Sequence, residues 1–191
     1  MEAFLNAALP AMLPQGVTFA MHVYQGKYDL LRKLPARLKG YQTWLPDNHR
    51  IVVLVDRDAD DAVQLKQSLE AVSAAAGLVT KTVAANDNWQ AVNRIAIEEL
   101  EAWYFGDWEA VKLAFPKVNS RVPQKAGFRD SDGIAGGTWE AFERTLQRSG
   151  YYKAGLRKVE AASAVAAHFD AGRCTSVSLQ HFRSALDSAT A

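Results

Sequence analysis

Residues 50–61 have the sequence RIVVLVDRDADD, and this stretch decides the fold class. Five apolar residues at 51–55 lead directly into an Asp-Arg-Asp triplet at 56–58. A short, uninterrupted and mostly β-branched run is typical of a strand that is buried on both faces, as in a parallel sheet. Polar side chains just beyond the carboxyl end of such a strand lie where α/β sheets bind their ligands. The stretch therefore predicts an α/β fold with a functional site at one edge of the sheet.

The acidic residues of this stretch fall into two groups. In an extended chain, Asp56 and Asp58 point the same way, and two carboxylates about 5 Å apart repel by roughly 3 kcal/mol at an effective dielectric constant near 20. A cation, a helix N-terminus or open water must offset that repulsion, and we expect a divalent metal ion. Asp60 and Asp61 are instead typical of the acidic first turn of a helix.

The composition of the chain bounds its class. Its 191 residues are 49% hydrophobic and 23% charged, which is typical of one globular domain with a full core. No apolar run is long enough to span a membrane, and no basic segment of the signal-peptide type opens the sequence. The single cysteine, Cys174, excludes a disulfide or a cysteine-based zinc site within one chain, and the four histidines show no ligand spacing. We expect a cytoplasmic protein.

The net charge of +1 hides an uneven distribution. Residues 51–115 hold 5 Lys/Arg against 11 Asp/Glu, whereas residues 1–50 hold 6 against 3 and residues 116–160 hold 9 against 5. An acidic middle between basic segments suits a metal site that acts on a polyanionic substrate. Ordinary scatter of surface charge explains the same counts equally well.

The apolar periodicity predicts helices that alternate with strands along most of the chain. We expect helices over 2–12, 28–45 and 60–76, a helix pair broken near Gly106, and helices over 139–149, 153–168 and 177–188. We expect strands over 17–24, 51–55, 78–84 and 92–97. This order predicts a doubly wound, mostly parallel sheet flanked by helices. Residues 1–115 would form the α/β core, and a basic loop and helices at 116–191 would pack on it in one compact domain.

A second acidic motif, EELEAWYFGD, spans residues 98–107. Glu98 and Glu101 share one helical face, so they are either neutral surface or converge on a cation or a basic partner. The four aromatic residues at 103–105 and 108 are more typical of core packing than of base stacking.

Basic residues cluster in two places near the carboxyl-terminal end. Lys153, Arg157 and Lys158 lie at a predicted helix start, where they are either a solvated face or contacts to phosphate. A basic loop at 116–137 carries three further candidate nucleic-acid contacts, Arg121, Lys125 and Arg129. Thr138 is the expected N-cap of the helix that follows.

Six stretches together resemble a small, uncharacterised bacterial family with a Toprim-like (Rossmann-like) fold. They cover nearly the whole chain: MEAFLNAALPAMLP, HVYQGKYDLLRKLPARLKGY, IVVLVDRDADD, VNRIAIEELEAWYFGDWEAV, IAGGTWEAF and YYKAGLRKVEAA. Toprim domains occur in topoisomerases, primases and the overcoming-lysogenization-defect nucleases. They place one acid after their first strand and an Asp-x-Asp pair after a later strand, and these acids bind magnesium for phosphodiester chemistry.

The resemblance implies roles for individual residues. Asp56 and Asp58 would form the Asp-x-Asp pair, one of Glu98, Glu99 or Glu101 would add a further acid, and Lys153 would contact the phosphate. These oxygen ligands favour Mg²⁺ or Mn²⁺. The resemblance also implies an ATPase partner in phage defence.

The sequence departs from the family at its beginning. In the family a strand ending in an acid precedes the helix that here begins MEAFL, so we expect the reading frame to start upstream of Met1.

Three functions follow from these patterns. The first is a Mg²⁺-dependent nuclease. The second is a non-catalytic Toprim-like module that binds a partner or nucleic acid, inactive because the first acid is absent. The third is a phosphatase that uses Asp56 as its nucleophile. DNA or RNA as substrate, and the oligomeric state, stay open.

Overall fold

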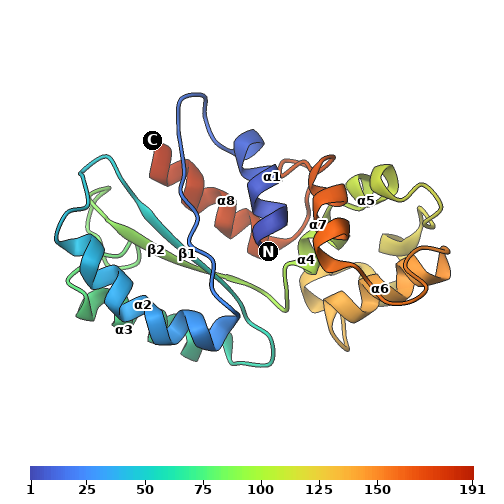
Figure 1. Cartoon of the computed structure of the whole chain (residues 1–191), viewed down its shortest axis with the longest axis horizontal. Coiled ribbons are helices and arrows are strands. Elements are labelled where there is room, and N and C mark those ends of the chain that lie inside the picture. Colours follow the sequence, from blue (N-terminus) through green and yellow to red (C-terminus); the bar gives the residue numbers. More distant parts are fainter.

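The computed structural model describes residues 1–191 and places eight α-helices around a small parallel sheet (Figure 1). The strands are β1 (Ile51–Asp56) and β2 (Ala91–Ala96). The helices are α1 (Glu2–Met12), α2 (Lys27–Gln42), α3 (Ala62–Ala75), α4 (Glu101–Gly106), α5 (Trp108–Ala114), α6 (Thr138–Arg148), α7 (Lys158–Ala166) and α8 (Val177–Thr190). Three 3-10 turns lie between α5 and α6, at Val122–Gln124, Ala126–Phe128 and Ser131–Gly133. None of the helices combines the length and the apolar character that crossing a bilayer requires.

The two strands pair in parallel, with Ile51 opposite Ala91 and Asp56 opposite Ala96. Side chains of β1 alternate between the two faces of the sheet. Val53 and Val55 belong to an apolar cluster formed with α2 and α3, which include Leu34, Leu38 and Leu69. Val52 and Leu54 pack on a larger cluster on the other side. The burial of β1 on both faces is as predicted.

The larger cluster joins the two ends of the chain. It contains 28 buried residues, from Phe4 on α1 through the aromatic residues of α4 to Leu186 on α8. Phe4 contacts the rings of Trp103, Tyr104 and Phe169 with centroid distances of 6.1, 5.3 and 4.8 Å. Figure 1 shows α1 beside α7 and α8, on the opposite side of the sheet from α2 and α3. The α/β class is therefore confirmed, but the sheet is smaller than the doubly wound one predicted.

The strand predicted at 17–24 does not form. This segment makes no ladder with β1 or β2. Met21 packs on the larger cluster and Tyr24 on the smaller one, and the His22 ring is hydrogen-bonded to the Tyr41 hydroxyl. Side chains of this segment pack on two separate clusters and do not line one face of a sheet. The strand predicted from their alternation is therefore wrong.

The strand predicted at 78–84 is reduced to a single bridge between Thr80 and Ala91. The hydroxyls of Thr80 and Thr82 both donate to the Glu70 carboxylate on α3, at 2.5 and 3.2 Å. The backbone N–H groups of Val83 and Ala84 donate to the Thr80 carbonyl. These bonds turn the chain away from the sheet after one residue.

The last three helices differ from the predictions mainly in one place. Helices α6 and α8 lie close to their predicted bounds, and Gly150 ends α6 with φ of +88°. The helix predicted at 153–168 begins only at Lys158, because Tyr152 and Gly155 have φ values of +48° and +117°. A left-handed backbone at these positions is incompatible with a continuous helix.

Candidate functional site

The carboxyl ends of β1 and β2 bring acidic residues to the same edge of the sheet. Asp56 is the last residue of β1 and is in register with Ala96, the last residue of β2. Glu98, Glu99 and Glu101 follow β2 directly. Since parallel strands end at the same edge, four of the chain's acids lie where α/β sheets place their ligand sites.

Asp56 is the acid at this edge whose charge is least compensated. Its Oδ1 atom is buried and has no hydrogen-bond partner. Burial, followed by the negative charge of Glu101, raises the pKa of Asp56 from 3.8 to about 7. A buried carboxyl oxygen without a donor costs free energy, and a proton or a cation beside it removes that cost.

Glu101 and Tyr104 complete the surroundings of Asp56. Burial raises the pKa of Glu101, and the charge of Glu99 adds to that rise. Burial also raises the pKa of the Tyr104 hydroxyl well above its ordinary value, with further contributions from Glu101 and Asp56. Asp56 and Glu101 form the Asp56–Glu101 pair. Their two carboxyl groups lie near the buried Tyr104 hydroxyl, and the charge of Glu101 raises the pKa of Asp56.

Asp58 and Glu98 face cations of the protein instead. Asp58 has φ of +51°, so the chain is not extended at this point and the expectation that Asp58 points the same way as Asp56 is wrong. Its carboxylate lies 2.9 Å from the Lys27 ammonium, which also lies 2.8 Å from Asp60. Glu98, with φ of +61°, forms an ion pair with Arg57. Both of these acids, which have left-handed backbone, are therefore neutralised by protein cations.

Glu99 holds the start of α6. Its carboxylate accepts hydrogen bonds from the Thr138 hydroxyl at 3.1 Å and from the backbone N–H of Trp139 at 2.9 Å. The prediction that Thr138 is the N-cap is wrong, because Gly137 occupies that position with φ of +85° and Thr138 is the first residue of the helix. A carboxylate from a distant segment satisfies the N-terminal N–H in place of a local cap.

Of the predicted basic residues, Lys158 is the one whose charge reaches the site. Its positive charge lowers the pKa of Glu101, and its ammonium lies 3.8 Å from the centroid of the Trp139 ring. Arg157 forms an ion pair with Glu160 at 3.2 Å, and Lys153 is exposed and forms none. The proposed phosphate contact at Lys153 therefore stays a prediction.

The basic loop lies on the surface. Arg121, Lys125 and Arg129 are exposed, and the Arg129 side chain donates to the Gln124 carbonyl at 3.2 Å. None of them is among the main causes of the pKa shifts of Asp56 or Glu101. Their role in binding nucleic acid stays a prediction.

Two residues at the site were not singled out from the sequence. Lys27 starts α2, and its side chain is 6% exposed while it contacts Asp58, Asp60 and the Arg57 carbonyl. Only its place beside Gly26, at a helix start, distinguishes it in the sequence. Tyr104 lies one helical turn after Glu101, and this spacing could have identified it.

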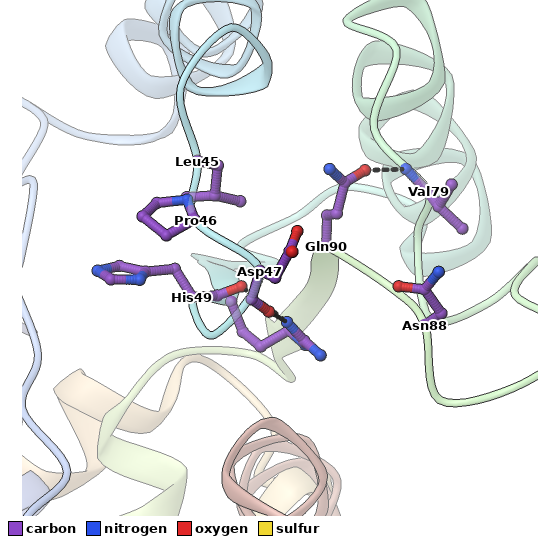
Figure 2. Close-up of a pocket in the computed structure, with 8 residues that line it drawn as sticks. Leu45, Pro46, Asp47, His49, Val79, Asn88 and Gln90 are labelled. Carbon is purple, nitrogen blue, oxygen red and sulfur yellow. Dashed lines mark hydrogen bonds between the residues drawn. The ribbon is translucent and has the colours of Figure 1, made fainter.

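A pocket of about 240 Å³ lies at the opposite end of the strands (Figure 2). Arg50 and Gln90, the residues that precede β1 and β2, line it together with His49 and Asn88. Much of its polar lining is already bonded within the protein, since Gln90 accepts from the Val79 N–H and Arg50 donates to the Asp47 carbonyl. It is therefore separate from the acidic site.

The acidic edge fits a magnesium ion better than a zinc ion. No group of three or more His, Cys, Asp or Glu side chains is arranged to enclose a metal. Mg²⁺, however, is usually held by one or two carboxylates, with water and substrate phosphates as its other ligands. Asp56 and Glu101 supply two carboxyl groups, and the unpartnered Oδ1 atom of Asp56 is the kind of atom that such an ion would bind.

Comparison with protein families gives one match, to the family described as Domain of unknown function (DUF4276), over residues 1–187. Neither the curated proteins nor the solved structures contain a match to this chain.

Proposed function

The chain belongs to the DUF4276 family, and we propose that it is a Mg²⁺-dependent phosphodiesterase that hydrolyses nucleic acid. The observation that carries the proposal is the buried Oδ1 atom of Asp56, which has no partner at the carboxyl end of β1. Burial and the nearby Glu101 raise the pKa of Asp56, so the site has more negative charge than the protein neutralises. We also propose that the fold is Toprim-like and that the protein acts in the cytoplasm with an ATPase partner in phage defence.

The residues divide the work as follows. Asp56 and Glu101 would hold Mg²⁺ or Mn²⁺, which activates water and stabilises charge on the phosphate oxygens. Lys158 would attract the phosphate backbone toward the pair, because its charge already reaches Glu101. The buried Tyr104, whose pKa both carboxyls raise, would help to keep them in surroundings of low polarity, which strengthens charge interactions there.

A plasmid-nicking assay with Mg²⁺ or Mn²⁺ tests this function. Asp56→Asn keeps the shape of the side chain and removes the charge, so we expect the rate to fall by about a hundredfold or more. Asp87→Asn is the matched control, because Asp87 is exposed and lies in the turn before β2, at the other end of the sheet. Equal nicking by the wild type and Asp56→Asn would rule the mechanism out.

A second candidate function is a non-catalytic module that binds a partner or nucleic acid. The observation that favours it is the neutralisation of Asp58 and Glu98 by Lys27 and Arg57. Melting curves with increasing Mg²⁺ separate the two functions. A metal-binding enzyme gains about 2.7 kcal/mol of stability at a Mg²⁺ concentration a hundred times the dissociation constant, and a module without a metal site gains none.

A further inference from the structure

The exposed aromatic side chains of this protein all lie near its amino-terminal end. Phe19, Tyr28 and Trp44 are 41%, 81% and 62% exposed, and every other Phe, Tyr or Trp is buried or half-buried. The aromatic residues of EELEAWYFGD, in contrast, are all core residues, as the packing interpretation predicted. Exposed Trp and Tyr rings lose contact with water when they bind a partner, so they mark a binding surface.

The same region is basic. Residues 26–44 contain five Lys/Arg and one Asp. Four of the cations, at 32, 33, 37 and 39, are exposed on α2. Arg32 and Lys33 pair with Asp29 at 2.6 and 2.9 Å, while Arg37 and Lys39 form no ion pair. The exposed face of α2 therefore has positive charge in excess of what its own acid neutralises.

Trp44 is held in place by its neighbours. Its ring lies 5.1 Å from that of Tyr41, and the Tyr41 hydroxyl is hydrogen-bonded to His22. Lys33, Arg37 and Tyr41 are spaced i, i+4 and i+8, which places them along one side of α2, and Trp44 follows in the turn after the helix. A fixed aromatic ring next to cations is the arrangement that single-stranded nucleic acid uses, with bases on rings and phosphates on cations.

Helix α2 connects the region around Trp44 with the candidate site. Lys27, in its first turn, contacts Asp58 and the Arg57 carbonyl at the carboxyl edge of the sheet. From there the helix runs along the outer side of the protein to the other end of the strands (Figure 1). Its 16 residues span about 24 Å, which is room for several nucleotides.

We propose that one side of α2 and the turn that follows it, with Lys33, Arg37 and Trp44 as the main contacts, bind single-stranded nucleic acid and direct it toward Asp56. Only the destination of the strand rests on the proposed function. Bases stacked within a duplex cannot stack on Trp44, so the surface distinguishes single from double strands. The proposal names the form of the substrate that the sequence left open.

Fluorescence anisotropy with a labelled homothymidine strand and a duplex of equal length tests the proposal. EDTA is present, so no metal-dependent cleavage occurs. We expect the single strand to bind more tightly. Trp44→Ala weakens binding about tenfold, and Trp44→Phe, which keeps a ring, recovers most of the loss. Lys33→Gln with Arg37→Gln reduces the slope of log K against log salt by about 1.4, at about 0.7 per phosphate contact on a single strand.

Arg144→Gln with Arg148→Gln is the matched control. These residues are two exposed cations on one face of α6, and neither forms an ion pair. We expect the binding and the salt slope of this variant to equal those of the wild type. Trp44 is also the only exposed tryptophan, so quenching of its emission on binding should disappear in Trp44→Phe.

Three outcomes overturn the proposal: equal or tighter binding of the duplex, no binding of either form, or wild-type binding by both Trp44→Ala and the double charge variant of α2. These two are called the α2 variants. The result is separable from that of the nicking assay. If Asp56→Asn nicks normally while the α2 variants lose single-strand binding, the proposed function fails and the proposal stands. If the α2 variants bind normally and Asp56→Asn is inactive, the proposed function stands and the proposal about single-strand binding fails.

Discussion

Asp107 and Asp56 are both acidic residues held in the interior, and their surroundings differ in every respect. Asp107 is 1% exposed, and its carboxylate accepts two hydrogen bonds from the Arg173 guanidinium at 2.6 and 2.9 Å. The backbone N–H of Asp170 donates to it at 2.8 Å. Asp56 has a buried oxygen without any donor, and the largest charge effect on its pKa comes from another acid, Glu101, ahead of the opposing charge of the N-terminal amine.

The difference separates a carboxylate that the protein satisfies from one that it leaves unsatisfied. Asp107 connects the turn between α4 and α5 to the segment that precedes α8, and its charge is matched where it lies. Such a pair stabilises the fold because both members are satisfied together. Asp56 accepts no such bonds through its buried oxygen, as the proposed function requires of a carboxylate that is left for a ligand.

The largest expected effect is the loss of the Asp107 carboxylate. Asp107→Ala leaves the half-exposed Arg173 guanidinium and the Asp170 N–H without their acceptor and removes the N-cap of α5, so we expect the free energy of unfolding to fall by about 3–4 kcal/mol. Urea denaturation measures this change, with Asp87→Asn as the control. A loss under about 1 kcal/mol would remove the distinction between the two aspartates.

Asp56→Asn should raise the free energy of unfolding, in contrast to Asp107→Ala. The folded protein binds the Asp56 proton more tightly than the unfolded chain does, because the pKa is raised from 3.8 to about 7. Stability from this group is therefore fully present below pH 3.8 and is lost as pH rises through about 7. We expect Asp56→Asn to be more stable than the wild type at pH 8, on the order of 3 kcal/mol, and equal to it near pH 4. Denaturant unfolding at both pH values measures this, and a destabilised variant at pH 8 contradicts it.

The smallest effect concerns Lys27, which gives Asp58 the compensation that Asp56 lacks. Lys27→Met keeps the buried stem and removes the charge, while Asp58 and Asp60 stay about half exposed to water. We therefore expect a loss of about 1 kcal/mol, smaller in high salt. If Asp58 can join Asp56 at a metal, the Mg²⁺-dependent rise in melting temperature should also grow in this variant. An unchanged rise would show that Asp58 takes no part.

The elements that the sequence predicted correctly are those whose apolar pattern matches the way they are buried in the fold. The run at 51–55 became β1 because both of its faces are buried, and α3 ends where Gly77 takes φ of +80°. The segments at 17–24 and 78–84 failed because distant partners decided them: two separate cores in one case and the Glu70 carboxylate in the other. Alternation alone does not say what each side chain will meet.

The same limit applies to the site. Parallel pairing made the shared edge of Asp56 and the three glutamates predictable, because it follows from strand direction alone. The partner of each acid was not predictable. Lys27 lies 31 residues before Asp58 in the chain, and Thr138 lies 39 residues after Glu99. Charges that meet only through the tertiary fold leave no local pattern in the sequence.

The two apolar clusters also imply an order of assembly. The smaller cluster uses only residues from Leu30 to Ala91, which are close in sequence, so its loop-closure entropy is modest and it can form as these residues leave the ribosome. The larger cluster needs Phe4 and Leu186 together, so α1 has to wait for α7 and α8. During synthesis the apolar face of α1 therefore stays uncovered until α7 and α8 have emerged, and apolar surface exposed at that stage favours aggregation.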